Sequence, residues 1–267
     1  MENLLKKLGL NNLFGGGDII YGKALSETRD LHAYFQRISE GCEEPIKNIV
    51  ERFKPRKMVS IASGVGVEEI VFEKYGCEVE CIEPDKASVE VCEYYIKELG
   101  AKNIKVHHFG VRDFESNKKF DLIYSSCPTD WMMSDFRQAV PKHYLEFFDK
   151  YGSEKCVIIV KLYTGAYQRP VLISSWLPKA ISQKLSQTRF RLKEYWTSDK
   201  GVRAVMIASN YELPKLNSME IFRGMTSAKE LKTFDGTVWK IEPYLIVTKH
   251  LIRRVFRKLG YDFLTNW

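Results

Sequence analysis

Short apolar runs alternate with longer amphipathic runs between residues 57 and 210, and this alternation constrains the fold more than any other feature. Five of the short runs have the length and composition of buried strands. They are Met58–Ala62, Glu78–Ile82, Ile104–His108, Phe120–Ser125 and Lys155–Leu162. Strands that alternate with helices indicate βαβ units, in which the strands are parallel. The sequence therefore predicts an α/β fold built on a mainly parallel sheet.

The longer runs have the period of amphipathic helices. In Lys86–Leu99 the apolar residues fall on one helical stripe, and Gly100 follows as a helix stop. Further helices are expected over Val67–Tyr75, Val140–Lys150 and Leu172–Lys184. The last two runs, Arg189–Trp196 and Val202–Ser209, flank turn residues and predict an antiparallel hairpin. The predicted fold is a Rossmann-like, seven-stranded sheet with helices on both faces and this hairpin at its end.

The same pattern divides the chain into three parts. Residues 57–210 form the predicted Rossmann-like domain, and residues 1–56, mostly helical in pattern after Ala24, are expected to form a helical cap or lid. Residues 211–267 form a C-terminal extension with a basic amphipathic segment, Lys249–Leu259. We expect this segment to dock on the core as a helix, and contact with RNA or a membrane surface is the alternative.

Composition narrows the classes of function. No run of about 18 apolar residues occurs and the first residues lack the pattern of a signal peptide, so a soluble, cytoplasmic protein is expected. The six cysteines are scattered without a CxxC pair and are expected to be free thiols, and no spacing of histidines and carboxylates predicts a metal site. The formal charge of +7 permits an anionic partner such as RNA without requiring one.

A loop with two glycines, Ala62-Ser63-Gly64-Val65-Gly66, joins the first expected strand to the first helix. The ligand crevice of a parallel sheet lies at the carboxyl ends of its strands, and glycine there lets the backbone approach a ligand closely. The helix that follows presents unpaired N–H groups. Glu83 stands seventeen residues beyond Gly66, at the end of the second strand, where its carboxylate can accept both hydroxyl hydrogens of a ribose. The combination predicts a nucleotide site.

The residues after the loop restrict which nucleotide it binds. Glu69 stands where a dinucleotide fingerprint has its third glycine, which disfavours NAD, and the Gly-Lys-Ser/Thr of a phosphate-binding loop is absent. Glu68 and Glu69 would repel a pyrophosphate, whereas they are compatible with a cationic sulfonium.

From Lys57 to Ser209 the chain resembles the class I S-adenosylmethionine-dependent methyltransferases. The resemblance includes the glycine loop, Cys81-Ile82-Glu83, the strand Phe120–Tyr124 and the terminal hairpin. In that family the loop approaches the methionine moiety, the acid holds the ribose and the segment after the third strand cradles the adenine. The resemblance therefore implies S-adenosylmethionine as the cofactor. It implies as cofactor-binding residues Ser63, Gly64, Gly66, Glu83, Pro84, Arg112, Asp113 and Ser125.

Two positions depart from the family's usual pattern. Ser60 stands where an acid is common, and Ala62 stands where a glycine is common. The Ser60 hydroxyl is expected to bond to amides of the loop instead.

Acceptor residues are expected at the ends of the fourth and fifth strands. Asp130 would orient or deprotonate an acceptor, and Trp131 would form an aromatic wall. Tyr124, in the fourth strand, and Tyr163, at the end of the fifth, complete the catalytic candidates. The Asn/Asp-Pro-Pro-aromatic motif of adenine-methylating enzymes is absent after the fourth strand, so methylation of an exocyclic base nitrogen is not supported. A small-molecule acceptor is expected, with RNA as the alternative.

Further resemblances leave the chemistry open. Tyr163-Thr164-Gly165 and Ile82-Glu83-Pro84-Asp85 look like segments of the nicotianamine synthase group, which implies transfer of the aminocarboxypropyl arm of the cofactor instead of its methyl group. Lys161 is similar to one lysine of the Lys-Asp-Lys-Glu tetrad of ribose 2′-O-methyltransferases, although Ser126 and Arg203 stand near the other expected positions. A non-catalytic module with this fold is the remaining alternative. The sequence indicates neither the identity of the acceptor nor the oligomeric state.

Overall fold

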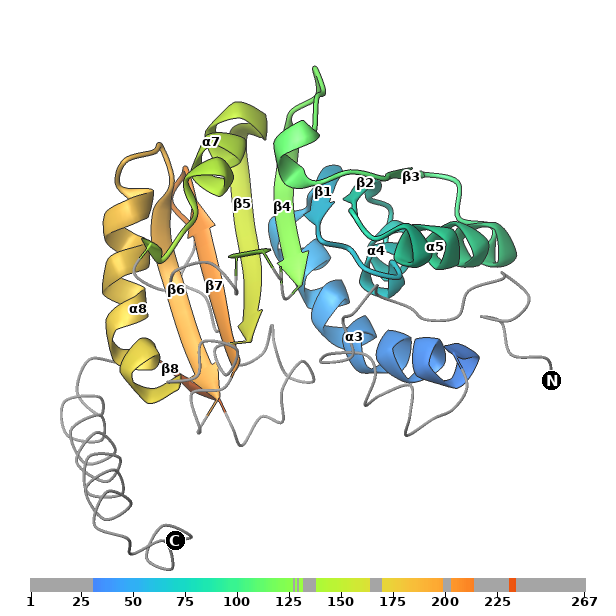
Figure 1. Ribbon diagram of the computed structural model, residues 1–267, viewed down its shortest axis with the longest axis horizontal. Helices are drawn as coiled ribbons and strands as arrows, with labels where there is room; N and C mark the ends of the chain where they lie inside the picture. The colour runs from blue at the N-terminus through green and yellow to red at the C-terminus, as the bar shows by residue number, and fades with distance from the viewer. Residues whose placement is uncertain are drawn as a thin grey trace, which may run out of the picture.

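The computed structural model describes residues 31–126, 128, 130, 131, 138–163, 170–198, 203–213 and 231–233. Its centre is an eight-stranded sheet with the strand order β3-β2-β1-β4-β5-β7-β6-β8 (Figure 1). The strands are β1 (Lys57–Ile61), β2 (Glu78–Ile82), β3 (Ile104–His107), β4 (Phe120–Ser126), β5 (Gly152–Tyr163), β6 (Arg191–Ser198), β7 (Arg203–Ser209) and β8 (Leu231–Thr233). β1 to β5 pair in parallel, whereas β7 pairs antiparallel with β5 and β6, and β8 pairs antiparallel with β6. The predicted Rossmann-like sheet and its hairpin are confirmed, and β8 adds one short strand.

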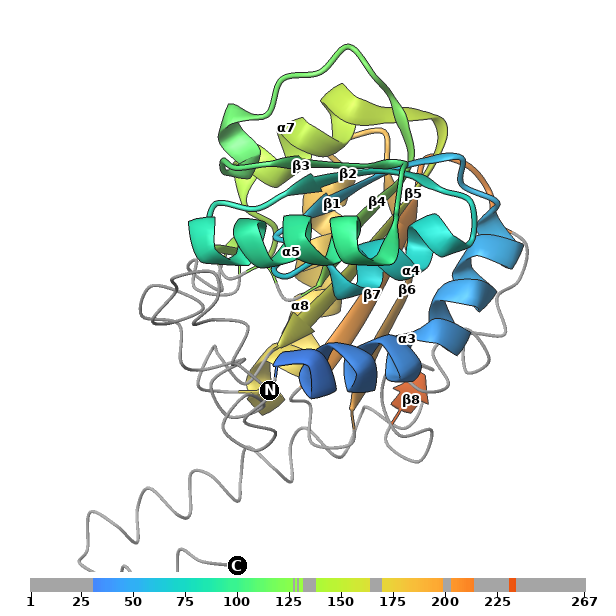
Figure 2. The same ribbon diagram turned by 90° about the vertical axis from the view of Figure 1, so that its right-hand side faces the viewer.

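Helices cover both faces of the sheet, as predicted (Figure 2). They are α3 (Leu31–Phe53), α4 (Val67–Lys74), α5 (Lys86–Leu99), the short 3-10 helix η1 (Val111–Asp113), α7 (Lys142–Tyr151) and α8 (Pro170–Leu185). Val59 and Ile123 pack in the core on the side of α7 and α8, while Met58 and Leu122 pack against α3 and α4. The central strands are apolar in nearly every position because both of their faces are buried.

The first described helix, α3, changes direction along its length (Figure 2). Pro45 lies inside it and accounts for the bend, because proline removes one backbone donor from the helix. Before the bend, Phe35 stacks on Tyr95 of α5 with 3.8 Å between ring centroids and packs in one cluster with Val65 of the glycine loop. Over residues 31–53 the predicted cap therefore lies against α4 and α5. Residues 1–30 and the basic segment Lys249–Leu259 lie outside the described residues.

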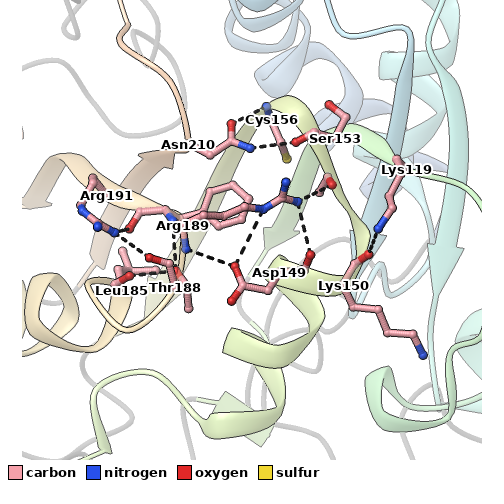
Figure 3. Close-up of polar contacts among 12 residues, drawn as sticks. Lys119, Asp149, Lys150, Ser153, Cys156, Leu185, Thr188, Arg189, Arg191 and Asn210 are labelled. Carbon is pink, nitrogen blue, oxygen red and sulfur yellow. Dashed lines mark hydrogen bonds and ion pairs between the residues drawn. The ribbon is translucent and has the colours of Figure 1, made fainter.

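The junction between α7 and β5 lies at the amino end of the sheet and has no loop (Figure 3). Gly152 begins β5 directly after α7, and a Cβ atom there would lie 2.7 Å from Phe190 Cζ. The Arg189 guanidinium donates to the carbonyl oxygens of Gly152 and Asp149, and Lys119 donates to the carbonyl of Lys150. These bonds hold the carboxyl end of α7 at the amino edge of the sheet. The amino end of α7, which begins at Lys142, then points toward the carboxyl edge.

Five cysteines, Cys42, Cys77, Cys81, Cys92 and Cys156, are free and buried, as predicted for thiols that fill the core. Cys127 lies outside the described residues. Among the described helices, none is both long and apolar enough to cross a membrane.

Candidate active site

The glycine loop follows β1, next to the point where the strand order reverses. Chain order runs outward from β1 through β2 to β3 and then continues with β4 on the other side of β1. Open α/β sheets bind their ligands at such a switch point, outside the carboxyl ends of the strands. The loop occupies this position, so the fold places it where a nucleotide is expected to bind.

Three residues of the loop adopt the left-handed backbone conformation. The φ angles are 56° at Ala62, 57° at Gly64 and 74° at Gly66. Gly66 is also restricted by contact, because a Cβ atom there would lie 2.2 Å from Cys92 Sγ of α5. Ala62 keeps the left-handed conformation without being a glycine, which costs roughly 1 kcal/mol. The loop thus retains the backbone path that glycine normally provides, although one glycine is missing.

Glu83 links the end of β2 to this loop. Its Oε2 accepts a hydrogen bond from the Gly64 amide at 2.7 Å, and its Oε1 accepts one from the Asp85 amide at 2.9 Å. The residue is 7% exposed, and burial raises the pKa of Glu83 while the two amide donors oppose this shift. Two carboxylate oxygens have about four acceptor positions, so two remain for ribose hydroxyls. The sequence placed Glu83 at the site, but it did not predict the bond to Gly64.

The other predicted cofactor residues lie at the ends of four strands, β1 to β4. Ser125 Oγ donates to the Ile61 carbonyl at 2.7 Å and so ties β4 to the end of β1. Ser63 is buried, and its hydroxyl has no hydrogen-bond partner among the described residues. Pro84 is exposed beside Glu83. Arg112 and Asp113 are exposed in η1 after β3. The glycine loop, Ser125 and Glu83 are therefore brought together, while Arg112 and Asp113 lie beyond the next strand end.

Ser60 does not bond to loop amides, contrary to expectation. Its hydroxyl donates to Oε1 of Glu69, in the first turn of α4, at 2.5 Å. Glu69 is 2% exposed, and burial together with the negative charge of Glu68 raises the pKa of Glu69 to about 8. The carboxyl group missing at position 60 is thus replaced in space by one from the neighbouring helix.

Sequence reasoning missed a buried cluster that connects α4 with β4 and β5. Lys161 of β5 forms an ion pair with Glu68, and the Tyr124 hydroxyl donates to Glu68 Oε2 at 2.8 Å. The side chains of Lys161 and Glu68 are 15% and 14% exposed. Burial and the charge of Glu68 raise the pKa of Tyr124 well above its usual value, so this candidate is held as a neutral phenol. Lys161 and Glu68 are 93 residues apart, and no local pattern could have paired them.

Asp130 stands after β4 and is held by two residues of α7. The Tyr144 hydroxyl donates to Asp130 Oδ1 at 2.7 Å, and Asp130 Oδ2 lies 3.1 Å from His143 Nε2. The other ring nitrogen of His143 lies 3.4 Å from an Arg112 nitrogen. The Asp130 side chain is 51% exposed, so it is oriented by its partners and still accessible to an acceptor. No sequence pattern indicated His143, because its partners lie 13 and 31 residues away along the chain.

Two other acceptor-side candidates have different outcomes. Trp131 was expected to form a pocket wall, but it is fully buried against Tyr144 and its indole donates to the Ala139 carbonyl at 2.7 Å. It belongs to the core because its ring packs against Tyr144 and Phe148 of α7. Tyr163 ends β5, and its side chain lies outside the described residues. In the part of the chain that the structure describes, no group of three or more His, Cys, Asp or Glu side chains could hold a metal ion.

Comparison with known proteins identifies the fold. No protein-family model and no curated protein matches the sequence. The structure matches an S-adenosylmethionine-dependent methyltransferase from Aquifex aeolicus with a TM-score of 0.50 and 12% identity, over 67% of this chain and 98% of that one. It also matches one from Clostridium acetobutylicum ATCC 824 with a TM-score of 0.50 and 11% identity, over 78% of this chain and 99% of that one. The chain has the fold of class I S-adenosylmethionine-dependent methyltransferases, as the sequence resemblance predicted.

Proposed function

We propose that the protein is an S-adenosylmethionine-dependent methyltransferase that acts on a small-molecule acceptor. The observation that carries this proposal is the bond from the Gly64 amide to Glu83. It joins the glycine loop and the acid at the end of β2 into one unit at the switch point of the sheet. A nucleoside bound there would meet a positioned backbone and a positioned carboxylate, with little reorganisation of either.

The residues present fit the cofactor. Glu83 retains acceptor positions for ribose hydroxyls, and the backbone of Ser63, Gly64 and Gly66 would face the methionine end. The family resemblance assigns the adenine to the segment after β3, where Asp113 would accept from its amino group beside the Arg112 backbone. Pro84 follows Glu83, and Ser125 is tied to the end of β1. When bound, S-adenosylmethionine supplies an electrophilic methyl group.

Asp130 is the base that the geometry supports best. It follows β4 at the carboxyl edge of the sheet, and Tyr144 and His143 hold its carboxylate in one orientation. An ammonium or hydroxyl acceptor placed there would transfer its proton to Asp130 as its lone pair attacks the methyl group. Tyr163, at the end of β5, is the second candidate for contact with the acceptor. Tyr124 supports Glu68 and Lys161 instead of facing an acceptor.

Calorimetry with S-adenosylmethionine tests the cofactor assignment. Glu83→Ala should weaken binding by about 1–3 kcal/mol, because hydrogen bonds to a charged group are lost. Glu78→Ala, on the exposed amino end of the same strand, is the matched control and should bind as the wild type does. Absence of binding at millimolar cofactor would leave the protein as a non-catalytic module of this fold.

Product analysis tests which arm of the cofactor is transferred. Incubation of the protein with cofactor and a fractionated pool of small metabolites should release S-adenosylhomocysteine. Release of methylthioadenosine would show aminocarboxypropyl transfer, and turnover only with added RNA would replace the small-molecule acceptor with a nucleic acid.

A further inference from the structure

A cleft of about 480 Å³ lies between the segment after β3 and α7, next to His143, which orients Asp130. Val111, Arg112 and Phe114 form one side, and residues of α7 form the other. Its floor is apolar, because Phe114, Phe147 and Tyr151 are each at most 3% exposed. Its volume is in the range of clefts that hold small ligands.

The polar lining of this cleft is strongly cationic. Arg112, Lys142 and Lys150 carry positive charges, and His143 lies between them. Of the lining residues that the structure describes, Glu146 alone is negative, and it already pairs with Lys142 at 3.3 Å. The charge of the cleft therefore favours an anion.

Two cations of this region, Lys118 and Arg189, are paired with carboxylates. Lys118 pairs with Glu78 at 2.6 Å and with Glu80 at 2.8 Å, and Arg189 pairs with Asp149 at 3.9 Å. In contrast, neither Arg112 nor Lys150 forms an ion pair with a carboxylate in the described part of the chain. Arg112, Lys142 and Lys150 line one cavity, which suits a compact anion better than an extended polymer such as RNA.

The cleft adjoins the acceptor side of the site. Arg112 lies within 3.4 Å of His143, and His143 contacts the Asp130 carboxylate at 3.1 Å. Lys142 and His143 stand in the first turn of α7, where positive side chains are unfavourable for the helix itself. A ligand held by Arg112 and Lys142 would therefore extend toward Asp130.

We propose that this cleft binds the phosphate group of a phosphorylated small molecule, with Arg112, Lys142 and Lys150 as its ligands. Arginine and lysine are the side chains that bind phosphate oxygens most strongly. The assignment of that molecule as the methyl acceptor rests on the proposed function, whereas phosphate binding itself does not. The cleft would hold the phosphate of the acceptor away from the reacting atom. The nucleophile, at the other end of the molecule, would then lie beside Asp130.

Calorimetric titration with inorganic phosphate and pyrophosphate, at ionic strength balanced with KCl, tests the site directly. The wild type should show saturable binding. Lys142→Gln and Lys150→Gln should each weaken it by about tenfold, the loss expected when one hydrogen bond between charged groups is removed. Lys86→Gln is the matched control, since Lys86 begins α5 and pairs with Glu90 as Lys142 begins α7 and pairs with Glu146. This control should bind phosphate as the wild type does.

Three results would overturn the proposal. The first is the absence of saturable phosphate binding, and the second is unchanged binding in both the Lys142 and the Lys150 variants. The third is tight binding of a mixed-sequence single-stranded RNA that pyrophosphate does not displace, which would assign the cleft to nucleic acid. Titration of Lys142→Gln and Lys150→Gln with S-adenosylmethionine should match the wild type. A wild type that binds phosphate but no cofactor would contradict the proposed function and leave the phosphate site standing.

Discussion

Glu69→Gln should leave the free energy of unfolding nearly unchanged at acid pH and raise it at alkaline pH. Glutamine keeps an oxygen where Ser60 donates its hydrogen bond, but it does not ionise. Burial and the charge of Glu68 raise the pKa of Glu69 from its ordinary 4.5 to about 8 in the folded protein. The folded state therefore holds the proton of Glu69 more tightly than the unfolded chain does.

The size of the effect follows from the two pKa values. Below about pH 4.5 both states are protonated, and the stabilisation due to this proton is fully present. It is lost as the pH rises to about 8, because the unfolded chain ionises first. The pKa values differ by about 3.5, and one pKa unit corresponds to about 1.36 kcal/mol, so the wild type loses up to about 5 kcal/mol over this range. The glutamine variant does not show this loss, because glutamine does not ionise.

Urea denaturation at about pH 5 and about pH 9 measures this difference. Glu69→Gln should be nearly as stable as the wild type at the lower pH and more stable by several kcal/mol at the higher pH. Glu80→Gln is the control with the opposite sign. Burial of Glu80 acts to raise its pKa, but hydrogen bonds from Lys118 and His107 outweigh burial and lower it. Its stabilisation is present above about pH 4.5, so Glu80→Gln should destabilise the protein at pH 9. A Glu69→Gln variant with the same stability difference at both pH values would refute the reasoning.

Two further changes probe the packing around the loop. Gly66→Ala should lower the melting temperature, because its Cβ would lie 2.2 Å from Cys92 Sγ, and the added change Cys92→Ala should recover part of the loss in differential scanning calorimetry. If Gly66→Ala had the melting temperature of the wild type, this contact would be contradicted. Lys161→Met should cost about 3–5 kcal/mol in urea denaturation, because it leaves Glu68 buried without its counterion. The double variant Lys161→Met with Glu68→Gln should lose less unfolding free energy than Lys161→Met alone. Equal losses would show that the ion pair is not the source of the effect.

Local patterns were sufficient to predict the fold and part of the site. The strands β1, β2 and β4 were predicted to within one residue at each end, because buried parallel strands are short apolar runs bounded by turns. The start of β5 was placed at Lys155, whereas the strand begins at Gly152. Its first residues are not apolar, and they join the strand because α7 leads into β5 without a loop.

Position along the chain also predicted the glycine loop and the acid at the end of β2. Gly64, Gly66 and Glu83 stand at strand ends. Parallel strands bring their carboxyl ends to one edge of the sheet, and this does not depend on how the helices pack. Backbone geometry fixes that edge. The sequence by itself therefore predicted that the glycine loop and Glu83 would meet at one edge of the sheet, as they do.

Tertiary structure alone decided which side chains meet. Glu68 with Lys161, Glu69 with Ser60, and Asp130 with His143 are pairs that depend on how α4 and α7 pack against the sheet. The orientation of a helix on a sheet is set by the fit of many side chains, which no spacing in the sequence encodes. The cationic cleft has the same origin, since Arg112 follows β3 and Lys142 begins α7, and only the packing of α7 brings them to one cavity.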